Sequence, residues 1–392
     1  MRELVNSLFA NSEHHELYMG VIETVEGIIR DFPEDAWKRK LIGDPELEQQ
    51  IQETVYGAGL MGLGIEERFG GMGGGLLGPV LVTDMLAQYG LTSFAQVLTS
   101  FCRAPLLNHG TPAQIEHYAV PSITGEKSFC ILATEPNAGT NTFNITTRAV
   151  KQGDKWVLNG QKVFITKAAE SDYGFLIAKT DLEAEGALSV FVLDMKNRGI
   201  ETQQMNINIF GGEDKQYTVF FDDVEMPLDA LVGEEGAGGK YMFAGLNAER
   251  LIISAMAAGT ADLALRETAR YVNDRTLFGG QPTGAYQAVQ HPLAQGKADT
   301  EAARLLLYHG VKLFDEGGDA GMYSNMAKLQ SANAATSLCD AAIQFHGGSG
   351  MDEDTGILAL WRTARVFKIA PINNEMILNY IAQHGIGLPR SY

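Results

Sequence analysis

Two stretches of the sequence hold residues whose types and spacing could do chemistry. The segment Ala133–Asn141 (ATEPNAGTN) is built largely from small residues, which let a backbone approach a planar ligand. The hydroxyls of Thr134 and Thr140 could donate hydrogen bonds to ring carbonyls or nitrogens, although composition alone favours a turn that leads into a strand. Glu249 is followed by an apolar helical run, where a carboxylate is costly unless it is paired or functional. The structural alternative for Glu249 is an ion pair with an Arg or a Lys.

The composition argues against several other kinds of function. The chain has 392 residues, with 30 Lys+Arg against 48 Asp+Glu and a formal net charge of −18. This balance disfavours a nucleic-acid binder, because phosphate backbones require clustered basic residues. The three cysteines are far apart and no histidine pair has metal-ligand spacing, so we expect no metal site and a reducing, cytoplasmic location. We also expect no signal peptide and no membrane insertion, because no stretch reaches the ~20 apolar residues of a transmembrane helix.

The periodicity of apolar residues divides the chain into three zones, which must position the Ala133–Asn141 segment and Glu249. Residues 1–122 are predicted to form an N-terminal all-helical domain, interrupted by a glycine-rich loop after Phe69. Residues 123–235 are predicted to form an antiparallel middle β domain. Residues 236–392 return to helical spacing and are predicted to form a C-terminal four-helix bundle. The fold class is therefore α+β.

Individual elements can be predicted within these zones. Asn159-Gly160 is a hairpin signal, so a turn is expected there between the strands Lys155–Leu158 and Lys162–Thr166. β-Branched or aromatic runs predict further strands at Tyr173–Lys179, Leu188–Asp194 and Tyr217–Phe221. Helical patterns predict four long helices at Ala244–Asn273, Tyr286–Phe314, Tyr323–Phe345 and Thr363–Ile386.

Several of these segments resemble motifs of the acyl-CoA dehydrogenase family. Ala133–Asn141 is similar to the flavin-contacting TEPGAGSD motif, and Trp156–Thr166 (WVLNGQKVFIT) to the hairpin that ends against the flavin. Phe221–Pro227 and Leu231–Gly236 resemble the segments that lead into the C-terminal helices. Arg275–Gln287 resembles the RxxFG…Q element that reaches FAD across a subunit interface, and Gln344–Gly350 resembles QxxGGxG. The motifs follow the family's order over roughly residues 60–390.

The resemblance implies FAD as the cofactor and assigns its contacts residue by residue. The residues along and over the isoalloxazine would be Ile131, Ala133, Thr134, Thr140, Phe164, Ile165 and Thr166. The FAD diphosphate and adenosine part would be bound by Arg275, Phe278 and Gln287, with Gln344, Gly347 and Gly348 of another subunit and with Asn373 and Glu375 as further contacts. An arginine suits a diphosphate because its guanidinium is planar and always charged. Outside this motif, Arg275 would be interpreted as a solvated residue at a helix end.

The resemblance also implies the reaction. In the family a carboxylate removes the α-proton of an acyl-CoA thioester while the β-hydride passes to flavin N5, which gives the 2-enoyl-CoA. Most members carry this Glu near the C-terminus, at a position where this sequence has Pro371. A minority, including the isovaleryl-CoA and long-chain enzymes, carries it on an earlier helix in a segment similar to Leu246–Arg250 (LNAER). Glu249 is therefore the predicted base and Glu375 the competing candidate. Thr140, Asn247 and Arg250 are predicted substrate contacts.

Two departures from the family pattern affect these expectations. Pro371 has no N–H, whereas in the family the backbone N–H at this position helps to polarise the thioester carbonyl. The loss of one such donor typically costs ~10²–10³ in rate. The segment Ile209–Lys215 (IFGGEDK) replaces the family's LGxRxS-like loop. Arg103 is not one of these departures. It is expected to form a surface ion pair rather than to contact the acyl chain.

Three functions remain open on the sequence. The first is an acyl-CoA dehydrogenase of fatty acid or lipid metabolism, a homotetramer that passes its electrons to an electron-transferring flavoprotein. The second is a flavin-dependent monooxygenase of the same fold, with which Pro371 is compatible and against which Glu249 argues. The third is a partner subunit of a hetero-oligomeric dehydrogenase, which the altered Ile209–Lys215 segment favours.

Overall fold

The protein is described from a computed structural model that covers residues 1–181, 187–209, 212 and 214–391. The chain divides into two compact units. One contains Met1–Thr92, Ile209–Glu213 and Asn247–Tyr392, and the other contains Ser93–Asn208 and Asp214–Leu246. Residues 210, 211 and 213 of the Ile209–Lys215 segment that departs from the family pattern lie outside the described residues. The expected domain boundaries at residues 122 and 235 stay a prediction.

The first unit is helical. Its N-terminal part contains five helices: α1 (Arg2–Phe9), α2 (His15–Asp31), α3 (Ala36–Ile42), α4 (Pro45–Gly57) and α5 (Leu77–Ala87). Its C-terminal part contains most of α8 (Gly238–Asp274), followed by α9 (Gln287–Asp315), α10 (Gly321–His346), α11 (Ile357–Val366) and α12 (Asn374–Gly385). The asparagine-capped start of α12 and the proline at the first position of α4 are ordinary helix-start signals.

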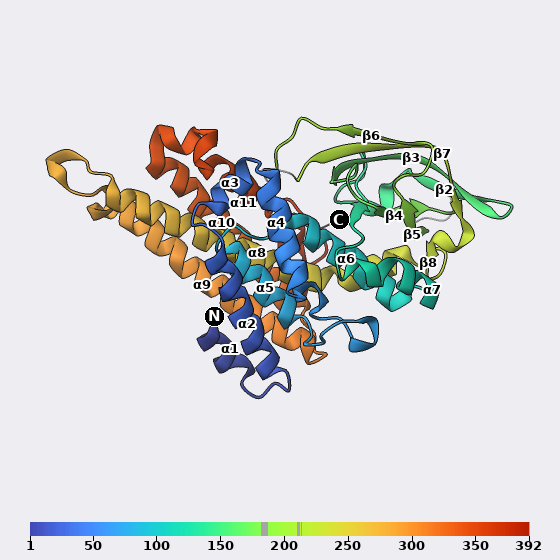
Figure 1. Ribbon diagram of the computed structural model, residues 1–392, viewed down its shortest axis with the longest axis horizontal. Helices are drawn as coiled ribbons and strands as arrows, with labels where there is room; N and C mark the ends of the chain where they lie inside the picture. Colours follow the sequence, from blue (N-terminus) through green and yellow to red (C-terminus); the bar gives the residue numbers. More distant parts are fainter. Residues whose placement is uncertain (182–186, 210–211, 213, 392) are drawn as a thin grey trace. The chain divides into compact units, whose positions relative to one another are not determined.

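Three long helices, α8, α9 and α10, form the centre of this unit and lie side by side (Figure 1). The middle of α8 is buried all round, since every residue from Leu251 to Ala261 is buried, which explains why its sequence shows little amphipathic contrast. Gly296 of α9 packs directly against Leu338 of α10, since a Cβ at residue 296 would lie 2.3 Å from the Leu338 side chain. Small residues therefore set how closely these helices approach.

A buried ion-pair network ties α5, α8 and α9 together. Arg304 donates to Asp84 through Nε (3.0 Å to Oδ2) and Nη2 (3.1 Å to Oδ1), and its Nη2 also lies 2.6 Å from Asp262 Oδ2. Tyr308 donates to the same Asp84 carboxylate at 3.2 Å. The Asp84 side chain is fully buried, so Arg304 neutralises a charge that could not otherwise be tolerated there.

The second unit is a mixed sheet with α6 (Phe94–His109) and the short α7 (Pro112–Gln114) beside it. Its strands are β1 (Phe129–Leu132), β2 (Arg148–Gln152), β3 (Lys155–Thr166), β4 (Tyr173–Lys179), β5 (Leu188–Asp194), β6 (Ile200–Gln204), β7 (Gln216–Pro227) and β8 (Leu231–Val232). The strand order is β6-β7-β3-β2-β4-β5-β8, with β1 paired to β4. Most pairs are antiparallel, but β1 runs parallel to β4 and β2 makes one parallel pairing with β4.

Strands β4 and β5 are buried on both faces. Leu176 and Ala178 of β4 point into a cluster with Trp156 and Phe191, whereas Phe175 and Ile177 point into a second cluster. That second cluster also contains residues of α6. Because successive side chains alternate between the two faces, a strand covered on both sides must be continuously apolar. This explains why these two strands were predicted with their observed bounds.

The hairpin predicted at Asn159-Gly160 is wrong. Strand β3 runs unbroken from Lys155 to Thr166, and the β2–β3 hairpin turns instead through Gly153 and Asp154. Gly160 has a φ of 146° and sits at a register shift against β7. A Cβ at residue 160 would meet Thr147 Oγ1 at 2.5 Å. Glycine is therefore required here for an irregularity inside a strand and not for a turn.

The single helix predicted at Thr363–Ile386 is also wrong, because the chain forms α11 and α12 with a break between them. Pro371 lies in this break, where a residue without an N–H cannot continue a helix. The break ends at Asn373, whose side chain caps α12 by accepting from the Met376 N–H at 2.9 Å. None of the described helices is long and apolar enough to cross a membrane.

Candidate functional site

Glu249 lies on α8 and is the most strongly perturbed carboxyl of the helical unit. Its side chain forms no hydrogen bond or ion pair within the described part of the chain. Burial raises the pKa of Glu249 to about 7, and the adjacent Arg250 opposes this rise only in part. The residue nevertheless keeps an intermediate exposure. A carboxyl that protein surrounds closely but that no donor occupies is available to exchange a proton near neutral pH.

Arg250 and Asn247 lie on the same stretch of α8 as Glu249. Arg250 donates from Nη1 to Asn247 Oδ1 at 3.0 Å, and Ser324 of α10 donates to the same oxygen at 3.0 Å. Arg250 Nε is buried and lacks a hydrogen-bond partner among the described residues. Burial lowers the pKa of Arg250, but a guanidinium stays charged. The turn that carries Glu249 is thus fixed to α10 and holds one unused donor.

The segment between α11 and α12 belongs to the same unit and contains Pro371 and Asn373, and Glu375 follows in α12. Pro371 and Glu375 are exposed and Asn373 is half-buried. Asn373 is the N-cap of α12, and Glu375 lies in the first helical turn, where a carboxylate is favoured by the helix dipole. Glu249, rather than Glu375, has the environment expected of a base.

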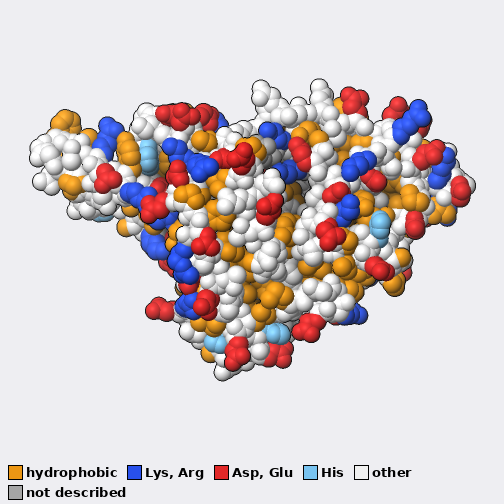
Figure 2. All heavy atoms as spheres, in the orientation of Figure 1, with side chains coloured by type: hydrophobic (Ala, Val, Ile, Leu, Met, Phe, Trp, Pro, Cys, Tyr) orange, Lys and Arg blue, Asp and Glu red, His pale blue; other side chains and the backbone are white. Residues whose placement is uncertain are grey.

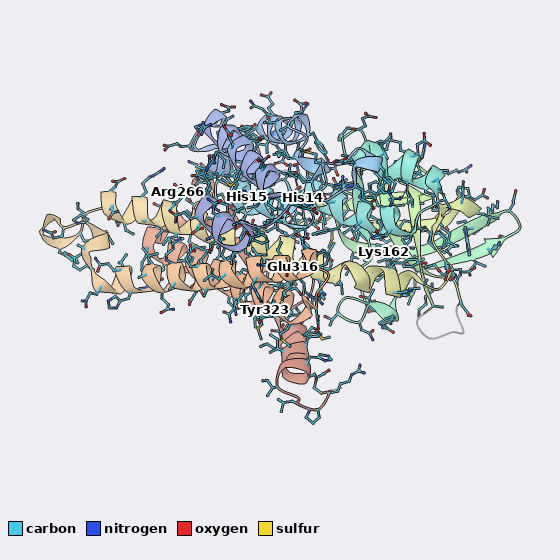
Figure 3. The ribbon with its side chains drawn as sticks, turned by 90° about the horizontal axis from the view of Figure 1, so that it is seen from below. His14, His15, Lys162, Arg266, Glu316 and Tyr323 are labelled. Carbon is cyan, nitrogen blue, oxygen red and sulfur yellow. The ribbon has the colours of Figure 1, made fainter. Side chains whose placement is uncertain are left out.

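In the β unit a buried ion pair joins the two predicted flavin-contacting segments. Lys162 of β3 donates from Nζ to Glu135 Oε1 and to the Ala133 carbonyl, both at 2.9 Å (Lys162 is labelled in Figure 3). Glu135 also accepts from the backbone N–H groups of Thr146 (2.6 Å) and Thr147 (3.0 Å). Burial by itself would raise the pKa of Glu135, but Lys162 and these donors lower it to about 2.

The backbone of these two segments is in direct contact. The Val163 N–H donates to the Thr134 carbonyl at 2.9 Å, which brings strand β3 alongside the Ala133–Asn141 segment. The next residue, Phe164, has a φ of 59° and exposes 52% of its surface. An aromatic residue with left-handed backbone dihedral angles and an exposed side chain is unusual. Such a residue is typically kept for contact with a ligand.

The other predicted flavin contacts of the β unit have mixed environments. Ile131, Ala133 and Thr134 are half-buried and Thr140 is exposed. Ile165 and Thr166 are buried, and Thr166 Oγ1 is hydrogen-bonded to the Gln216 side chain. The structure therefore brings Ala133, Thr134, Phe164 and their neighbours to one wall of the sheet, whereas Ile165 and Thr166 mainly complete the core behind it.

The predicted diphosphate and adenosine contacts gather where α8 and α10 end. Arg275 donates to the Tyr271 hydroxyl at 2.7 Å, and the Tyr271 ring stacks on His346 at 4.1 Å between centroids. This contact places Arg275 near the QFHGGSG segment of the same chain. The remaining members of the set are exposed: Phe278 (89%), Gln287, Gln344, Gly347 and Gly348.

The donors present there fit a dinucleotide. Arg275 offers an exposed guanidinium, which suits a diphosphate. A Cβ at Gly347 or Gly348 would meet no described atom within 4 Å, so the backbone is open to approach. The described residues contain no group of three or more His, Cys, Asp or Glu that could hold a metal ion.

Sequence reasoning missed four residues of these arrangements and misplaced a fifth. The missed residues are Glu135, Lys162, Tyr271 and Lys328 of α10, whose Nζ donates to the Ile372 carbonyl next to Pro371 at 2.6 Å. A lysine in an apolar strand or in an alanine-rich helix indicates a costly buried charge. The same kind of signal pointed to Glu249. Arg103, expected at the surface, is only 3% exposed and donates to the Ser122 carbonyl at 3.1 Å.

Comparison with protein families identifies the class that this fold and site define. The N-terminal, middle and C-terminal domain models of acyl-CoA dehydrogenase match residues 11–126, 130–224 and 236–386. The chain therefore belongs to the acyl-CoA dehydrogenase family, which confirms both the resemblance and the expected three-part α+β fold. Membership makes it a flavoprotein oxidoreductase of the class that acts on acyl-CoA.

Individual relatives are similar over most of their length. Acyl-CoA dehydrogenase FadE12 of Mycobacterium tuberculosis is 35% identical over 339 residues, which cover 85% of this chain and 87% of the relative. The caffeyl-CoA reductase-Etf complex subunit CarC of Acetobacterium woodii is 30% identical, covering 88% and 93%. Among solved structures, butyryl-CoA dehydrogenase from Megasphaera elsdenii aligns with a TM-score of 0.84 and 28% identity over 94% of this chain and 98% of that one.

Proposed function

We propose that this protein catalyses the FAD-dependent α,β-dehydrogenation of an acyl-CoA thioester to the 2-enoyl-CoA. Glu249 takes the α-proton as the hydride leaves the β-carbon, so that the acyl thioester becomes the 2-enoyl thioester. Bound FAD supplies the hydride acceptor. The residues of this chain bind the cofactor, orient the substrate and move the proton.

The state of Glu249 carries this proposal. A general base works best when its pKa lies near the operating pH, and burial raises the pKa of Glu249 to about 7. Since no donor of the described residues occupies the carboxylate, its oxygens are free to accept the α-proton. Arg250, with its buried and unused Nε, supplies a donor on the next residue for the substrate or for a charge that develops on it.

FAD is supported by donors in both units. We propose that the wall around Ala133, Thr134 and Phe164 contacts the isoalloxazine, and that Arg275 binds the diphosphate and adenosine part together with Gly347 and Gly348 of another subunit. A solved relative, PigA in complex with FAD, aligns with a TM-score of 0.84 and 26% identity over 94% of this chain and 97% of that one. Asn373 and Glu375 remain proposed cofactor contacts on the start of α12.

The test is anaerobic mixing of the purified holoenzyme with a panel of straight and branched acyl-CoAs while the oxidised flavin absorption is followed. We expect at least one class of thioester to bleach the band. Glu249→Gln should retain FAD and lower the rate of bleaching by about 10²–10⁴-fold. Glu301→Gln, a half-exposed carboxylate of α9 paired with Lys297, is the matched control and should react like the native enzyme.

The outcomes separate the three functions. A yellow protein that no thioester bleaches, but that consumes oxygen once its flavin is reduced, would make it a monooxygenase. A yellow protein that reacts only when a second chain is added would make it a partner subunit. An active Glu249→Gln enzyme would overturn the assignment of the base.

We propose an electron-transferring flavoprotein as the electron acceptor. The relative CarC is named as a subunit of a complex with such a protein, and the electron-transferring flavoprotein structure of Acidaminococcus fermentans aligns with a TM-score of 0.84. The measurement is the rate at which the substrate-reduced enzyme passes electrons to a purified flavoprotein of this type.

We propose a homotetramer because large apolar side chains stand in solvent on the C-terminal helices and their connections. Phe278 is 89% exposed, and Leu305, Met351, Leu378 and Ile386 are each more than half exposed. A symmetric oligomer can cover such side chains in the interfaces between its subunits. On the face shown in Figure 2, acidic and basic side chains are interspersed among the apolar ones. The mass in solution tests this proposal, and the cytoplasmic location stays a prediction.

A further inference from the structure

Three lysines among the described residues are buried, and one of them differs from the other two. Lys40 lies 3.3 Å from the Glu48 carboxylate, and Lys162 lies 2.9 Å from that of Glu135. Lys328 of α10 is fully buried, yet its Nζ donates only to neutral oxygens in the described structure: the Ile372 carbonyl at 2.6 Å and Asn374 Oδ1 at 3.1 Å. A buried ammonium without a carboxylate partner is costly and needs a reason.

The Lys328 acceptors belong to the segment that contains Pro371. Ile372 is the next residue, and Asn374 begins α12. The Asn374 side chain is itself held, since its Nδ2 donates to Asn333 Oδ1 at 3.1 Å, and its backbone N–H donates to the Lys368 carbonyl. The Lys328 ammonium therefore anchors, from α10, the part of the chain where the family's backbone donor has been replaced by proline.

The same face of α10 also holds the turn of α8 that carries Glu249. Ser324 lies four residues before Lys328, one turn along the helix, and next to Tyr323, which Figure 3 labels. Ser324 donates to Asn247 Oδ1, which also accepts from Arg250. One helix face thus fixes both the α8 turn with Glu249 and the Pro371 segment.

We propose that Lys328 is a positioning residue, which in its protonated form holds the Pro371–Asn374 segment in register with the Glu249 turn through the Ile372 carbonyl. This inference rests on the proposed dehydrogenation. Pro371 offers no N–H to the thioester carbonyl, so the other groups of the segment must be placed accurately. The ammonium also adds positive charge to a region in which the reacting carbonyl becomes more negative.

The charged groups around Lys328 set its protonation. Burial, together with the charges of Arg250 of α8 and Lys368 of the α11–α12 connection, lowers the pKa of Lys328 to about 7, and Glu375 of α12 opposes this shift. Lys328 should therefore lose its proton as the pH rises through about 7. Its two bonds then lose their charge assistance, and the rate of flavin reduction should fall on the alkaline side.

The experiment compares Lys328→Gln, which keeps a neutral donor, with Lys328→Met, which keeps none. The control is Lys312→Met on α9, because Lys312 Nζ also donates to a backbone carbonyl, that of Leu8 at 3.2 Å, which belongs neither to the Glu249 turn nor to the Pro371–Asn374 segment. We expect Lys328→Gln to lower kcat for anaerobic flavin reduction by about 10- to 100-fold with little change in KM. The fall in rate above about pH 7 should be absent from the pH profile of Lys328→Gln. Lys312→Met should leave both kcat and the pH profile unchanged.

Hydrogen exchange supplies a readout that needs no substrate. Peptides that cover residues 368–376 should exchange faster in Lys328→Gln than in the native protein and should be unaffected in Lys312→Met. If no thioester bleaches the native flavin, the proposed function fails, while this exchange result still decides the positioning role. Native exchange together with a native pH profile in Lys328→Gln would overturn the inference, even if Lys328→Met fails to fold.

Discussion

Replacing Lys162 by methionine tests the buried ion pair of the β unit most directly. The substitution removes an ammonium that is fully buried, together with its bonds to Glu135 and to the Ala133 carbonyl, and it leaves the hydrocarbon volume nearly unchanged. The Glu135 side chain, 2% exposed, would then carry its charge with only the Thr146 and Thr147 donors. Breaking such a buried pair from one side typically costs about 3–5 kcal/mol. We expect a loss of this size in the free energy of unfolding.

The assay is equilibrium denaturant unfolding of the native and variant proteins. The amount of FAD that each protein retains is measured as well. Lys155→Met is the matched control, because Lys155 lies on the same strand and pairs with Glu225 at the surface. That exposed pair should contribute about 0–1 kcal/mol. The double variant Glu135→Gln/Lys162→Met should recover part of the loss, since it leaves no uncompensated charge.

The pH dependence gives a second check with a definite sign. The pKa of Glu135 is lowered to about 2 in the folded protein, below its unfolded value. Its contribution is therefore fully present above pH ~4.5 and is lost as the pH falls towards 2. The double variant should lack this part of the acid limb. A Lys162→Met protein as stable as Lys155→Met would refute the reasoning, because the Glu135 charge would then not depend on its partner.

Three further outcomes are expected. Flavin reduction in Lys328→Gln should rise with pH through about 7 and then level off, because Glu249 must lose its proton to act as a base and burial raises its pKa to about 7. Phe278→Ala should weaken FAD binding and promote dissociation into smaller species, measured by cofactor titration and by mass in solution, because this ring is 89% exposed on a single chain. Arg304→Met should destabilise the helical unit by about 3–5 kcal/mol in denaturant unfolding, because it leaves Asp84 buried without its cation.

Each of these expectations can be contradicted by a single result. A rate independent of pH between 5 and 9 (about two units on either side of neutrality) would mean that Glu249 is not the titrating base. An unchanged mass and FAD affinity in Phe278→Ala would remove that side chain from both the cofactor site and the subunit interface. If Arg304→Met loses less than about 1 kcal/mol, the Asp84 charge is relieved by another route.

The sequence predicted most of the elements and the main chemical group, for identifiable reasons. Tyr173–Lys179 and Leu188–Asp194 were found with the observed bounds because both are continuously apolar and buried on both faces. Glu249 was selected as the candidate base because a carboxylate beside an apolar helical run is unusual and its motif is distinctive, and its role stays a prediction. These are local signals, which a single sequence contains.

Other features depended on residues far apart in the chain and could not be predicted in this way. Asn159-Gly160 has the composition of a turn, but Thr147 on the neighbouring strand needs the space that a Cβ would fill, so the strand continues. The two helices predicted as one separate at Pro371, whose surroundings are fixed by Lys328 from 44 residues earlier in sequence. The pattern of residue types along the sequence does not show which distant residues come into contact.

The sequence by itself determined the family, the residue types at the site and the separation of helical and β zones, because each is written in local motifs and periodicity. The tertiary structure decided which of the charged residues are neutralised. Lys162 forms an ion pair with Glu135, and Arg304 forms one with Asp84, which lies 220 residues away in sequence. Lys328 donates only to neutral oxygens of the described residues. Protonation follows from burial and from the nearest charges, and both are set only when distant segments pack together.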